Sequence, residues 1–363
     1  MRKYLLVIGT SFPLKGGATK ITEFYSRLFS KNNLKTIRFS YNDIFNFKNS
    51  NDLKPYVTIN PFLKISSYLY ILTRVFILRN KTKAAYIEEN GGIFKIFDFL
   101  LMYLLTSLKI KCYYHNHSYQ KINSPNFLTK MIVLLTSRGI TNIFLNEIEA
   151  TRFIKIYGPT KYYAVSNSIF INDDCSNFIE YSNEKLKFGL LSNFHKNKGL
   201  DEFIEIAKYA MKNKKPWEFY LAGPIIYNPF FYKEQICSLD NFKYLGPIYE
   251  KKQKNQFFKN LTFFVHLSTY KHESEPYVVL EAISKSCIPL VFDEGSSSEL
   301  VPYKKLILDK TKDIPLRVDL LIQNLQLSKN IKVLKKNSYE NFCKLRKDGE
   351  KNLNELIQEI KKI

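Results

Sequence analysis

The chain has 363 residues, of which 45% are hydrophobic, and its 55 Lys and Arg against 33 Asp and Glu give a formal net charge of +22. This length suits two domains rather than one core, and the 29 Phe and 25 Tyr residues exclude global disorder. The excess of positive charge predicts an anionic partner: a phosphorylated ligand, nucleic acid or the headgroups of an inner membrane leaflet.

Neither a disulfide framework nor a membrane-spanning segment is indicated. The five cysteines are odd in number and scattered, and no two form a C-x-x-C pair, so a zinc site is not expected either. The longest uncharged runs, residues 99–108 and 219–232, are shorter than the roughly 20 apolar residues that span a bilayer. We therefore expect a cytoplasmic protein that contacts, at most, the inner face of the plasma membrane.

Strands and helices alternate through the first half of the sequence. Residues 3–9 (KYLLVIG) predict a buried strand rather than a signal peptide, and a loop rich in glycine and proline leads to an amphipathic helix at 18–31. The elements expected further along are a strand at 83–89, a buried helix at 93–109, and strands at 110–118 and 141–146. Such alternation is typical of a parallel sheet.

A polar segment at 172–185 interrupts this pattern, which then starts again. The second series comprises strands at 187–192, 217–223, 242–246, 262–268 and 287–292, and helices at 200–213, at 251–260 and from residue 276. The lysine-rich tail from about residue 314 predicts one or two surface helices. We therefore expect α/β domains at 1–170 and 171–340, and a final helix at 341–363 that could pack back toward the first domain.

Two glutamates, Glu273 and Glu281, stand eight positions apart in YKHESEPYVVLEAISKSCIPLV (270–291). The first follows the strand at 262–268, and the second lies more than one turn into a helix that begins near Pro276. Ligands of open α/β sheets bind beyond the carboxyl ends of strands, where carboxylates accept hydrogen bonds from hydroxyls and helix N-termini bind phosphate. A nucleotide sugar offers both groups. For two glutamates taken alone, solvated surface positions are the more common explanation.

The residues around the two glutamates resemble a known family. ESEPYVVLEAISKSCIPLV (273–291) closely resembles the E-G-F-P-N-V-L-L-E-A segment of retaining family 4 glycosyltransferases. The resemblance implies the α/β GT-B fold, in which two Rossmann-like domains have parallel sheets facing across a cleft. It also implies that Glu273 contacts the donor sugar, that Glu281 contacts the nucleotide ribose, and that Pro276 and Tyr277 open a helix beside the donor.

A second segment is similar to the same family. FGLLSNFHKNKGLDEFIEIAKYA (188–210) looks like the family's G-R-L-x-x-x-K-G-x-D segment, which implies that Lys198 binds the donor phosphate. Asn193 stands where the family usually has an arginine, so one phosphate-binding cation is missing from the pattern. Lys196 or His195 could supply that charge, and the alternative is that both are solvated loop residues.

Three further landmarks complete the implied site. DEGSSSELV (293–301) resembles the family's G-G-x-x-E segment and implies that Glu299 lies near the nucleotide. PLKGGATK resembles the glycine-rich loop of the first domain, where Gly16 and Gly17 would let backbone N–H groups approach a diphosphate. His117, in CYYHNHS, matches a histidine that hydrogen-bonds near the donor sugar in family members.

The resemblance implies a hexosyltransferase that needs no metal or other cofactor and retains the anomeric configuration, with Glu273, His117 and Lys198 as its catalytic residues. The donor would be a UDP- or GDP-sugar. The acceptor would be a glycan or a polyprenyl-linked glycan, as in the assembly of O-antigen, capsule or lipopolysaccharide. The chain contains no D-x-D sequence, and the two histidines of CYYHNHS have no evident third metal ligand.

Two other classes of function stay open. A GT-B protein without activity would act as a nucleotide-sugar sensor or a partner subunit, and the missing arginine at Asn193 is consistent with that alternative. A nucleic-acid-binding protein would explain the net charge, but the sequence has no zinc finger, RNP-like motif or concentrated basic recognition helix, so no nucleic-acid partner is expected.

The stretch PFLKISSYLYILTRVFILRN (61–80) bears on the acceptor. As a helix, it could present an apolar face flanked by Lys64, Arg74 and Arg79, which would suit an anionic membrane surface and a lipid-linked acceptor. A helix that packs on the core, with solvated basic residues, is the alternative.

Overall fold

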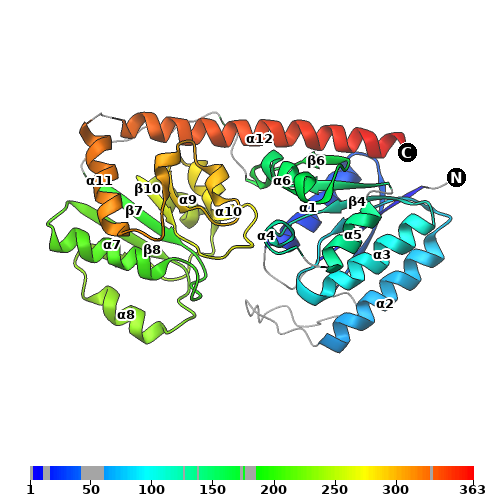
Figure 1. Ribbon diagram of the computed structural model, residues 1–363, viewed down its shortest axis with the longest axis horizontal. Coiled ribbons are helices and arrows are strands. Elements are labelled where there is room, and N and C mark those ends of the chain that lie inside the picture. Colours follow the sequence, from blue (N-terminus) through cyan, green and yellow to red (C-terminus); the bar gives the residue numbers. More distant parts are fainter. Residues whose placement is uncertain are drawn as a thin grey trace. The chain divides into compact units, whose positions relative to one another are not determined.

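The computed structural model describes residues 3–10, 17–41, 61–125, 127–136, 139–171, 175, 185–327 and 330–363. The chain divides into two compact units (Figure 1). Unit 1 comprises Met1–Ser166 together with Asp348–Ile363, and unit 2 comprises Asn167–Lys347. The polar segment predicted at 172–185 lies almost entirely outside the described residues.

Unit 1 is built on a six-stranded parallel sheet with the strand order β2-β1-β3-β4-β5-β6. The strands are β1 (Tyr4–Gly9), β2 (Lys35–Ser40), β3 (Thr82–Glu88), β4 (Lys111–His115), β5 (Ile140–Phe144) and β6 (Tyr162–Ala164). Their central members are nearly continuous apolar runs, because helices cover both faces of a parallel sheet. The four strands predicted for this half are confirmed, whereas β2 and β6 were not predicted.

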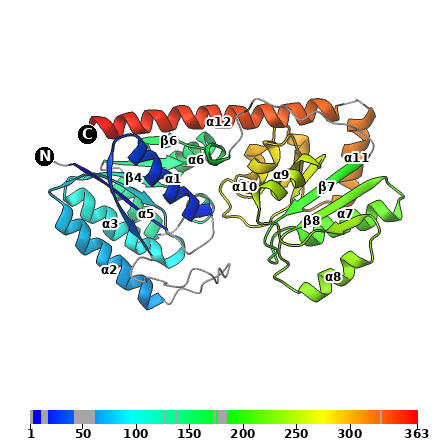
Figure 2. The ribbon, with the colours of Figure 1, turned by 180° about the vertical axis from the view of Figure 1, so that it is seen from behind.

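Helices cover both faces of this sheet. They are α1 (Gly17–Lys31), α2 (Pro61–Leu78), α3 (Lys95–Ser107), α4 (Gln120–Asn123), α5 (Phe127–Thr136) and α6 (Glu147–Tyr157), with a 3-10 turn η1 (Gly92–Phe94) before α3. Figures 1 and 2, seen from opposite sides, show α1 on one face and α2, α3 and α5 on the other. On the latter face, Tyr68 of α2 and Leu101 of α3 pack against Tyr114 of β4 in one core cluster.

The expectation of a buried helix at 93–109 is wrong for one side of α3. Leu101 is buried, but Ile96, Leu100 and Tyr103 are 41% to 58% exposed. Apolar residues occupy both the inner and the outer side of this helix, so periodicity alone did not separate the two sides. Among the described residues, no helix is long and apolar enough to cross a membrane.

Unit 2 contains a second six-stranded parallel sheet, with the strand order β12-β11-β10-β7-β8-β9. The strands are β7 (Leu186–Leu191), β8 (Trp217–Ala222), β9 (Phe242–Tyr244), β10 (Phe263–His266), β11 (Ile288–Phe292) and β12 (Ile307–Leu308). Phe188 of β7 stacks on both Phe219 of β8 and Phe263 of β10, with ring centroids 5.1 and 5.0 Å apart. The predicted fold class, two parallel α/β sheets of the GT-B type, is confirmed.

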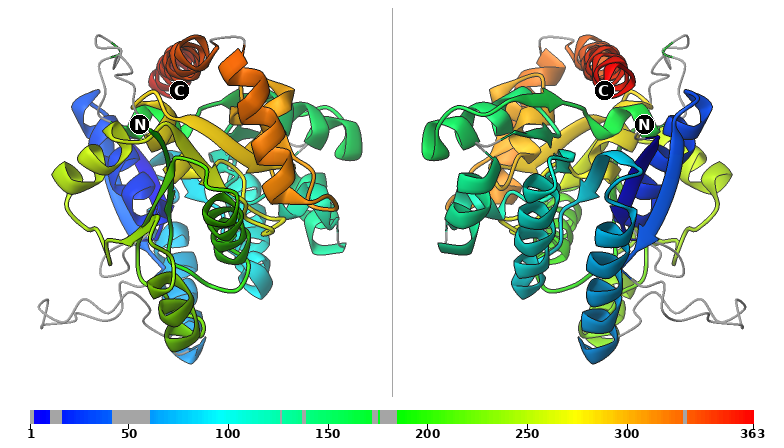
Figure 3. Two further views of the ribbon diagram at one scale, coloured as in Figure 1. Left: turned by 90° about the vertical axis from the view of Figure 1, so that its left-hand side faces the viewer. Right: turned by 90° about the vertical axis from the view of Figure 1, so that its right-hand side faces the viewer.

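The helices of unit 2 follow the predicted order, with one addition, α8. They are α7 (Leu200–Lys212), α8 (Pro229–Cys237), α9 (Lys251–Lys259), α10 (Tyr277–Ile283), α11 (Ile314–Leu327) and α12 (Ile331–Lys362), with 3-10 turns η2 (Asn167–Phe170), η3 (Ser297–Leu300) and η4 (Lys304–Leu306). The predicted tail is therefore two helices. The second, α12, is a single helix that contributes residues to both units and is seen nearly end-on in Figure 3.

Glu359 attaches the last turns of α12 to the sheet of unit 1. Its carboxylate accepts hydrogen bonds from the hydroxyls of Tyr113 (3.0 Å) and Tyr163 (2.6 Å). It also pairs with Lys111 and Lys161, at 2.9 and 2.6 Å. Burial opposes ionisation of this carboxyl, but the four partners outweigh it and lower the pKa of Glu359 to about 2.

Replacing Glu359 by glutamine should loosen the end of α12. Loss of the charge weakens partly exposed contacts by about 1–2 kcal/mol, so amide exchange of residues 348–362 should become roughly tenfold faster at pH 7. Glu355→Gln, an exposed position on the same helix, is the control. Because the pKa is depressed, the difference from wild type should shrink as pH falls from about 4.5 toward 2. A difference that is the same at every pH would contradict this account.

Candidate functional site

The loop after β10 holds Glu273 and is fixed by contacts within unit 2. Gly199 and Gly295 adopt left-handed backbone conformations, with φ of 75° and 61°. A Cβ atom at Gly199 would overlap the carbonyl group of Leu267, and one at Gly295 would overlap that of Glu273. The backbone N–H of Ser296 donates to the same Glu273 carbonyl at 3.2 Å. Both glycines are therefore needed for two backbone segments to approach this loop.

Glu273 forms an ionic cluster with Lys198, and His266 lies beside it. The Nζ atom of Lys198 lies 3.3 Å from both carboxylate oxygens, and Nε2 of His266 lies 3.3 Å from Oε2. Lys198 precedes α7 and His266 ends β10, so the three side chains meet beyond the carboxyl ends of β7 and β10. Burial opposes ionisation of Glu273, but His266 and Lys198 outweigh it and lower its pKa to about 2. Glu273 is therefore a carboxylate at neutral pH.

The cluster remains accessible from solvent. The side chains of Lys198 and Glu273 are 23% and 22% exposed. An ammonium group binds phosphate oxygens, and a carboxylate accepts hydrogen bonds from hydroxyl groups. The pair is therefore suited to a ligand that carries both a phosphate and hydroxyls.

Glu281 has a different partner. Its two carboxylate oxygens accept hydrogen bonds from Nζ of Lys254 on α9, at 2.7 and 2.6 Å. Pro276 is the N-cap of α10, and Glu281 is the fifth residue of this helix, more than one turn in, as predicted. Tyr277, the first residue of α10, is half-buried, and its hydroxyl donates to a backbone carbonyl of η2.

The remaining predicted donor-binding residues are spread over both units. Asn193 is exposed in the loop after β7, and so are Lys196 and His195, the two residues considered as replacements for the missing cation. Glu299 is half-buried in η3, a segment that packs against α10. Gly17 is the first residue of α1, and Gly16 lies outside the described residues. In the part of the chain that the structure describes, no three or more His, Cys, Asp and Glu side chains are placed to hold a metal ion.

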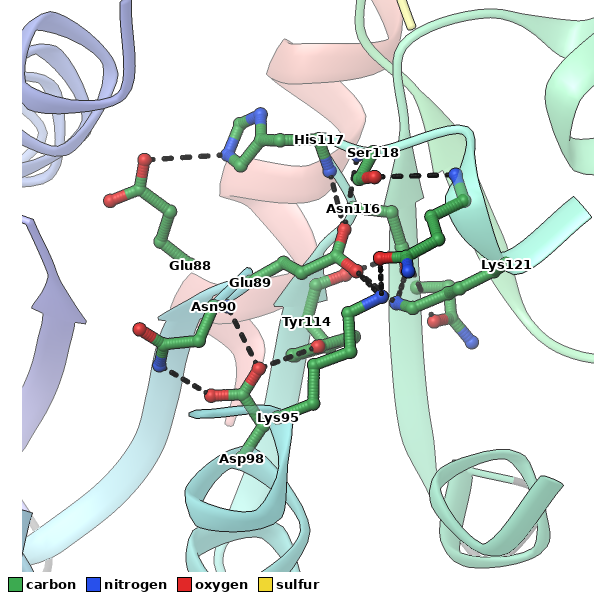
Figure 4. A network of polar contacts seen from close by, with 12 residues as sticks. Glu88, Glu89, Asn90, Lys95, Asp98, Tyr114, Asn116, His117, Ser118 and Lys121 are labelled. Carbon is green, nitrogen blue, oxygen red and sulfur yellow. Dashed lines mark hydrogen bonds and ion pairs between the residues drawn. The ribbon is translucent and has the colours of Figure 1, made fainter. Parts of the chain in front are cut away.

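His117 belongs to unit 1, where a buried glutamate holds its backbone (Figure 4). The N–H groups of His117 and Ser118 donate to Oε2 of Glu89, at 2.8 and 3.1 Å. Lys95 and Lys121 each place Nζ 3.2 Å from Oε1 of Glu89. Burial raises the pKa of Glu89, but Lys121 and Lys95 outweigh it and the pKa is lowered. Glu89 is thus an ionised, buried anchor for the loop after β4.

Glu88, one position earlier, has a raised pKa instead of a lowered one. Its Oε2 atom accepts hydrogen bonds from the Thr10 N–H, at 2.9 Å, and from the Thr22 hydroxyl. Its Oε1 atom lies 3.6 Å from Nε2 of His117. Burial raises the pKa of Glu88 to about 8, and burial lowers the pKa of His117 to about 4. Both side chains are therefore uncharged at neutral pH.

Sequence reasoning does not assign His266, Lys254, Glu88 or Glu89. His266 gave a usable signal, because it is a polar residue at the carboxyl end of an apolar strand. Glu88 and Glu89 gave a similar one, since two acids end the predicted strand KAAYIEE. Lys254 gave none, because its pairing with Glu281 depends on how α9 packs beside α10.

Comparison with known proteins finds a glycosyl transferase family over part of the chain. Residues 176–338 match the model of the family described as glycosyl transferases group 1. The structure of Anabaena HepE (Alr3699) in complex with UDP and glucose is similar over 98% of this chain and 99% of that one, with 14% identity and a TM-score of 0.62. Sucrose-phosphate synthase from Thermosynechococcus elongatus is similar over 99% of both chains, with 12% identity and a TM-score of 0.67. A comparison with curated proteins finds no match.

The likeness to these two structures shows that the chain has the GT-B fold. The family match covers residues 176–338, which is less than half of the chain. The matched segment includes the ionic cluster of Lys198 and Glu273, as well as Glu281 and Glu299.

Replacing Glu273 by glutamine should destabilise unit 2 in a pH-dependent way. At pH 7 the loss of a paired carboxylate should lower the free energy of unfolding by about 1–3 kcal/mol. Because the pKa of Glu273 is depressed, this difference should be full above pH 4.5 and disappear as pH falls toward 2. Urea unfolding can be followed by the fluorescence of Trp217, the single tryptophan, which is buried in β8.

The matched control for this experiment is Glu234→Gln, at an exposed position on α8 of the same unit. It should leave the Trp217 transition within about 0.5 kcal/mol of wild type. Equal stability of Glu273→Gln and wild type at pH 7 would overturn the ionic cluster as a feature of the native state.

Proposed function

We propose that the protein is a glycosyltransferase that takes a nucleoside-diphosphate sugar as donor and binds it through unit 2. The observation that carries this proposal is the Lys198–Glu273 pair beyond the carboxyl ends of β7 and β10, inside the segment that matches the glycosyl transferases group 1. The HepE structure with UDP and glucose favours a uridine nucleotide as the first donor to examine.

The proposed chemistry follows from the charges of this pair. Breaking the bond between sugar and diphosphate leaves negative charge on the departing phosphate oxygens, and a preorganised cation stabilises that charge. Lys198 would exchange part of its contact with Glu273 for the diphosphate. Glu273, ionised at neutral pH, would then accept hydrogen bonds from the sugar hydroxyls.

The finer parts of the proposal concern stereochemistry and acceptor. We infer a family 4 reaction that retains the anomeric configuration and needs no bound metal, in the cytoplasm, with a glycan or polyprenyl-linked acceptor of surface-polysaccharide assembly. The anomeric configuration of the product, read by NMR, tests retention. Turnover in the presence of a chelator tests metal independence.

A second candidate is a protein that binds a nucleotide sugar without transferring it. The observation that favours it is Asn193, which is exposed after β7 and brings no positive charge to the place where a phosphate-binding arginine is expected. Binding of a donor without hydrolysis or transfer, across a panel of acceptors, would select this candidate.

Substitution of the ionic pair tests the enzyme proposal directly. With a panel of UDP- and GDP-sugars, Lys198→Ala and Glu273→Ala should each lower kcat/KM by about a hundredfold or more, because they remove transition-state charge stabilisation or sugar orientation. Lys233→Ala, at an exposed position on α8, is the control and should be unchanged. Equal turnover by wild type, Lys198→Ala and Glu273→Ala would refute the assigned site.

The outer side of α2 supports peripheral contact with an anionic membrane. Phe62, Leu69 and Phe76 are spaced seven residues apart, lie on one side of the helix and are 76%, 57% and 51% exposed. The guanidinium group of Arg79 lies 4.2 Å from the ring centroid of Phe76. Exposed apolar side chains with adjacent cations are typical of an interface with anionic lipids.

Vesicle flotation tests this part of the proposal. Wild type should float with vesicles that contain an anionic lipid, more strongly at low salt, and not with neutral vesicles. The double substitution Leu69→Glu and Phe76→Glu should weaken this binding at least tenfold, since it removes two apolar contacts and adds two negative charges. Phe230→Glu, at an 88% exposed position in unit 2, is the control. Equal flotation with neutral and anionic vesicles would remove the support for membrane contact.

A further inference from the structure

The resemblance implies a hydrogen bond from His117 near the donor sugar, but neither it nor the comparisons assign a role to Glu88, the buried acid that faces this histidine. Glu88 is 1% exposed, and its Oε1 atom faces Nε2 of His117 at 3.6 Å (Figure 4). Within the described residues, neither of these two facing atoms has a hydrogen-bond partner, and 3.6 Å is slightly longer than a hydrogen bond. Two buried polar atoms in this position share a proton or remain unsatisfied.

The local backbone is built to admit this glutamate. A Cβ atom at Gly9, the last residue of β1, would overlap the side chains of Glu88 and Thr22. A glycine at this position thus leaves room for the carboxyl group beyond the carboxyl ends of β1, β3 and β4. The Thr10 N–H and the Thr22 hydroxyl then occupy Oε2, which leaves Oε1 as the oxygen that carries any proton.

The proton on Oε1 determines the tautomer of His117. When Glu88 is protonated, its O–H donates to Nε2, and the neutral imidazole must hold its own proton on Nδ1. When Glu88 is ionised, Nε2 must carry the proton that it donates, and Nδ1 of the neutral ring becomes an acceptor. Because the His117 side chain keeps 17% exposure while Nε2 is buried, Nδ1 is the polar ring atom left for a ligand.

Burial decides between these states at neutral pH. It raises the pKa of Glu88 to about 8 and lowers that of His117 to about 4. Arg38 on β2 and Asp98 on α3 act on Glu88, and Glu89 after β3 and Lys121 on α4 act on His117. Tyr41 after β2 and Tyr86 on β3 interact with Glu88, and His115 on β4 interacts with His117. Tyr25 on α1 packs against the rings of Tyr86 and His115. Burial outweighs these interactions, so both groups are uncharged at neutral pH.

We propose that Glu88 is a positioning residue that holds His117 in its Nδ1-protonated tautomer, so that the imidazole presents Nδ1–H as a hydrogen-bond donor to an oxygen atom of a nucleotide sugar. The identity of this ligand rests on the proposed function, whereas the tautomer of His117 does not. As pH rises through 8, Glu88 ionises, Nδ1 loses its proton to Nε2, and the donated hydrogen bond is lost.

The tautomer can be measured without any ligand. In protein labelled with 15N-histidine, only five imidazoles contribute, and two-bond correlation spectra distinguish Nδ1–H from Nε2–H. A His117→Asn sample assigns the signal. Wild type should show the Nδ1–H tautomer at pH 7 and change to Nε2–H with a midpoint near pH 8. An Nε2–H tautomer at pH 7, or an imidazolium there, would overturn the proposal.

Glu88→Gln is the discriminating variant. The glutamine carbonyl can accept from Thr10 and Thr22 while its NH2 group donates to Nε2, so His117 should stay in the Nδ1–H form up to pH 9.5. The exposed His195 is the internal control, since its signals should be alike in both proteins. The same change of tautomer in Glu88→Gln as in wild type would also overturn the proposal. If the variant does not fold, the wild-type titration still decides the neutral-pH tautomer.

Calorimetry with UDP-glucose tests the ligand part. Wild type should lose about tenfold in affinity between pH 7 and pH 9, the effect of one hydrogen bond, while Glu88→Gln should lose none. Equal losses in both proteins would overturn the donated hydrogen bond. Failure of the proposed function would show itself differently, as no binding of any nucleotide sugar by a wild type whose His117 still changes tautomer near pH 8.

Discussion

The chemistry of this molecule depends on one constraint: both faces of each parallel sheet are covered by helices, so charged side chains gather at the strand ends. In unit 2, Glu273 and Lys198 meet beyond the ends of β7 and β10, with His266 at the end of β10. In unit 1, Glu88 ends β3 and His117 follows β4. Each polar cluster is thus held by rigid strands while the apolar interior excludes water from its back.

Position at a strand end also explains why two neighbouring carboxyl groups differ in charge, one neutral and one negative. Glu88 and Glu89 are adjacent, and their side chains diverge because successive residues of a strand point to opposite sides. Glu89 contacts two buried lysines and is ionised. Glu88 contacts the Thr10 N–H, the Thr22 hydroxyl and a neutral histidine, and it is protonated at neutral pH. Ionisation at these strand ends is therefore decided by the helix or loop that each side chain meets.

Much of the fold could be predicted from the sequence, because apolar strands such as β7 and β10 and amphipathic helices such as α7 have strong local patterns. β2, β6 and β12 were missed because they lie at sheet edges and are short or carry polar residues. In the candidate site, Lys198 and Glu273 could be identified from local motifs. Their partner His266 and the pairing of Glu281 with Lys254 depend on packing between distant segments, which spacing along the chain does not encode.

The course of α12 has a consequence for how the chain is made. Unit 1 consists of Met1–Ser166 and Asp348–Ile363, so the residues that complete it are translated after the whole of unit 2. Until then, Lys111 and Lys161 lack the carboxylate of Glu359, and buried contacts of Leu356 and Ile360 are missing from the growing polypeptide. The half that is synthesised first is therefore the half that is completed last.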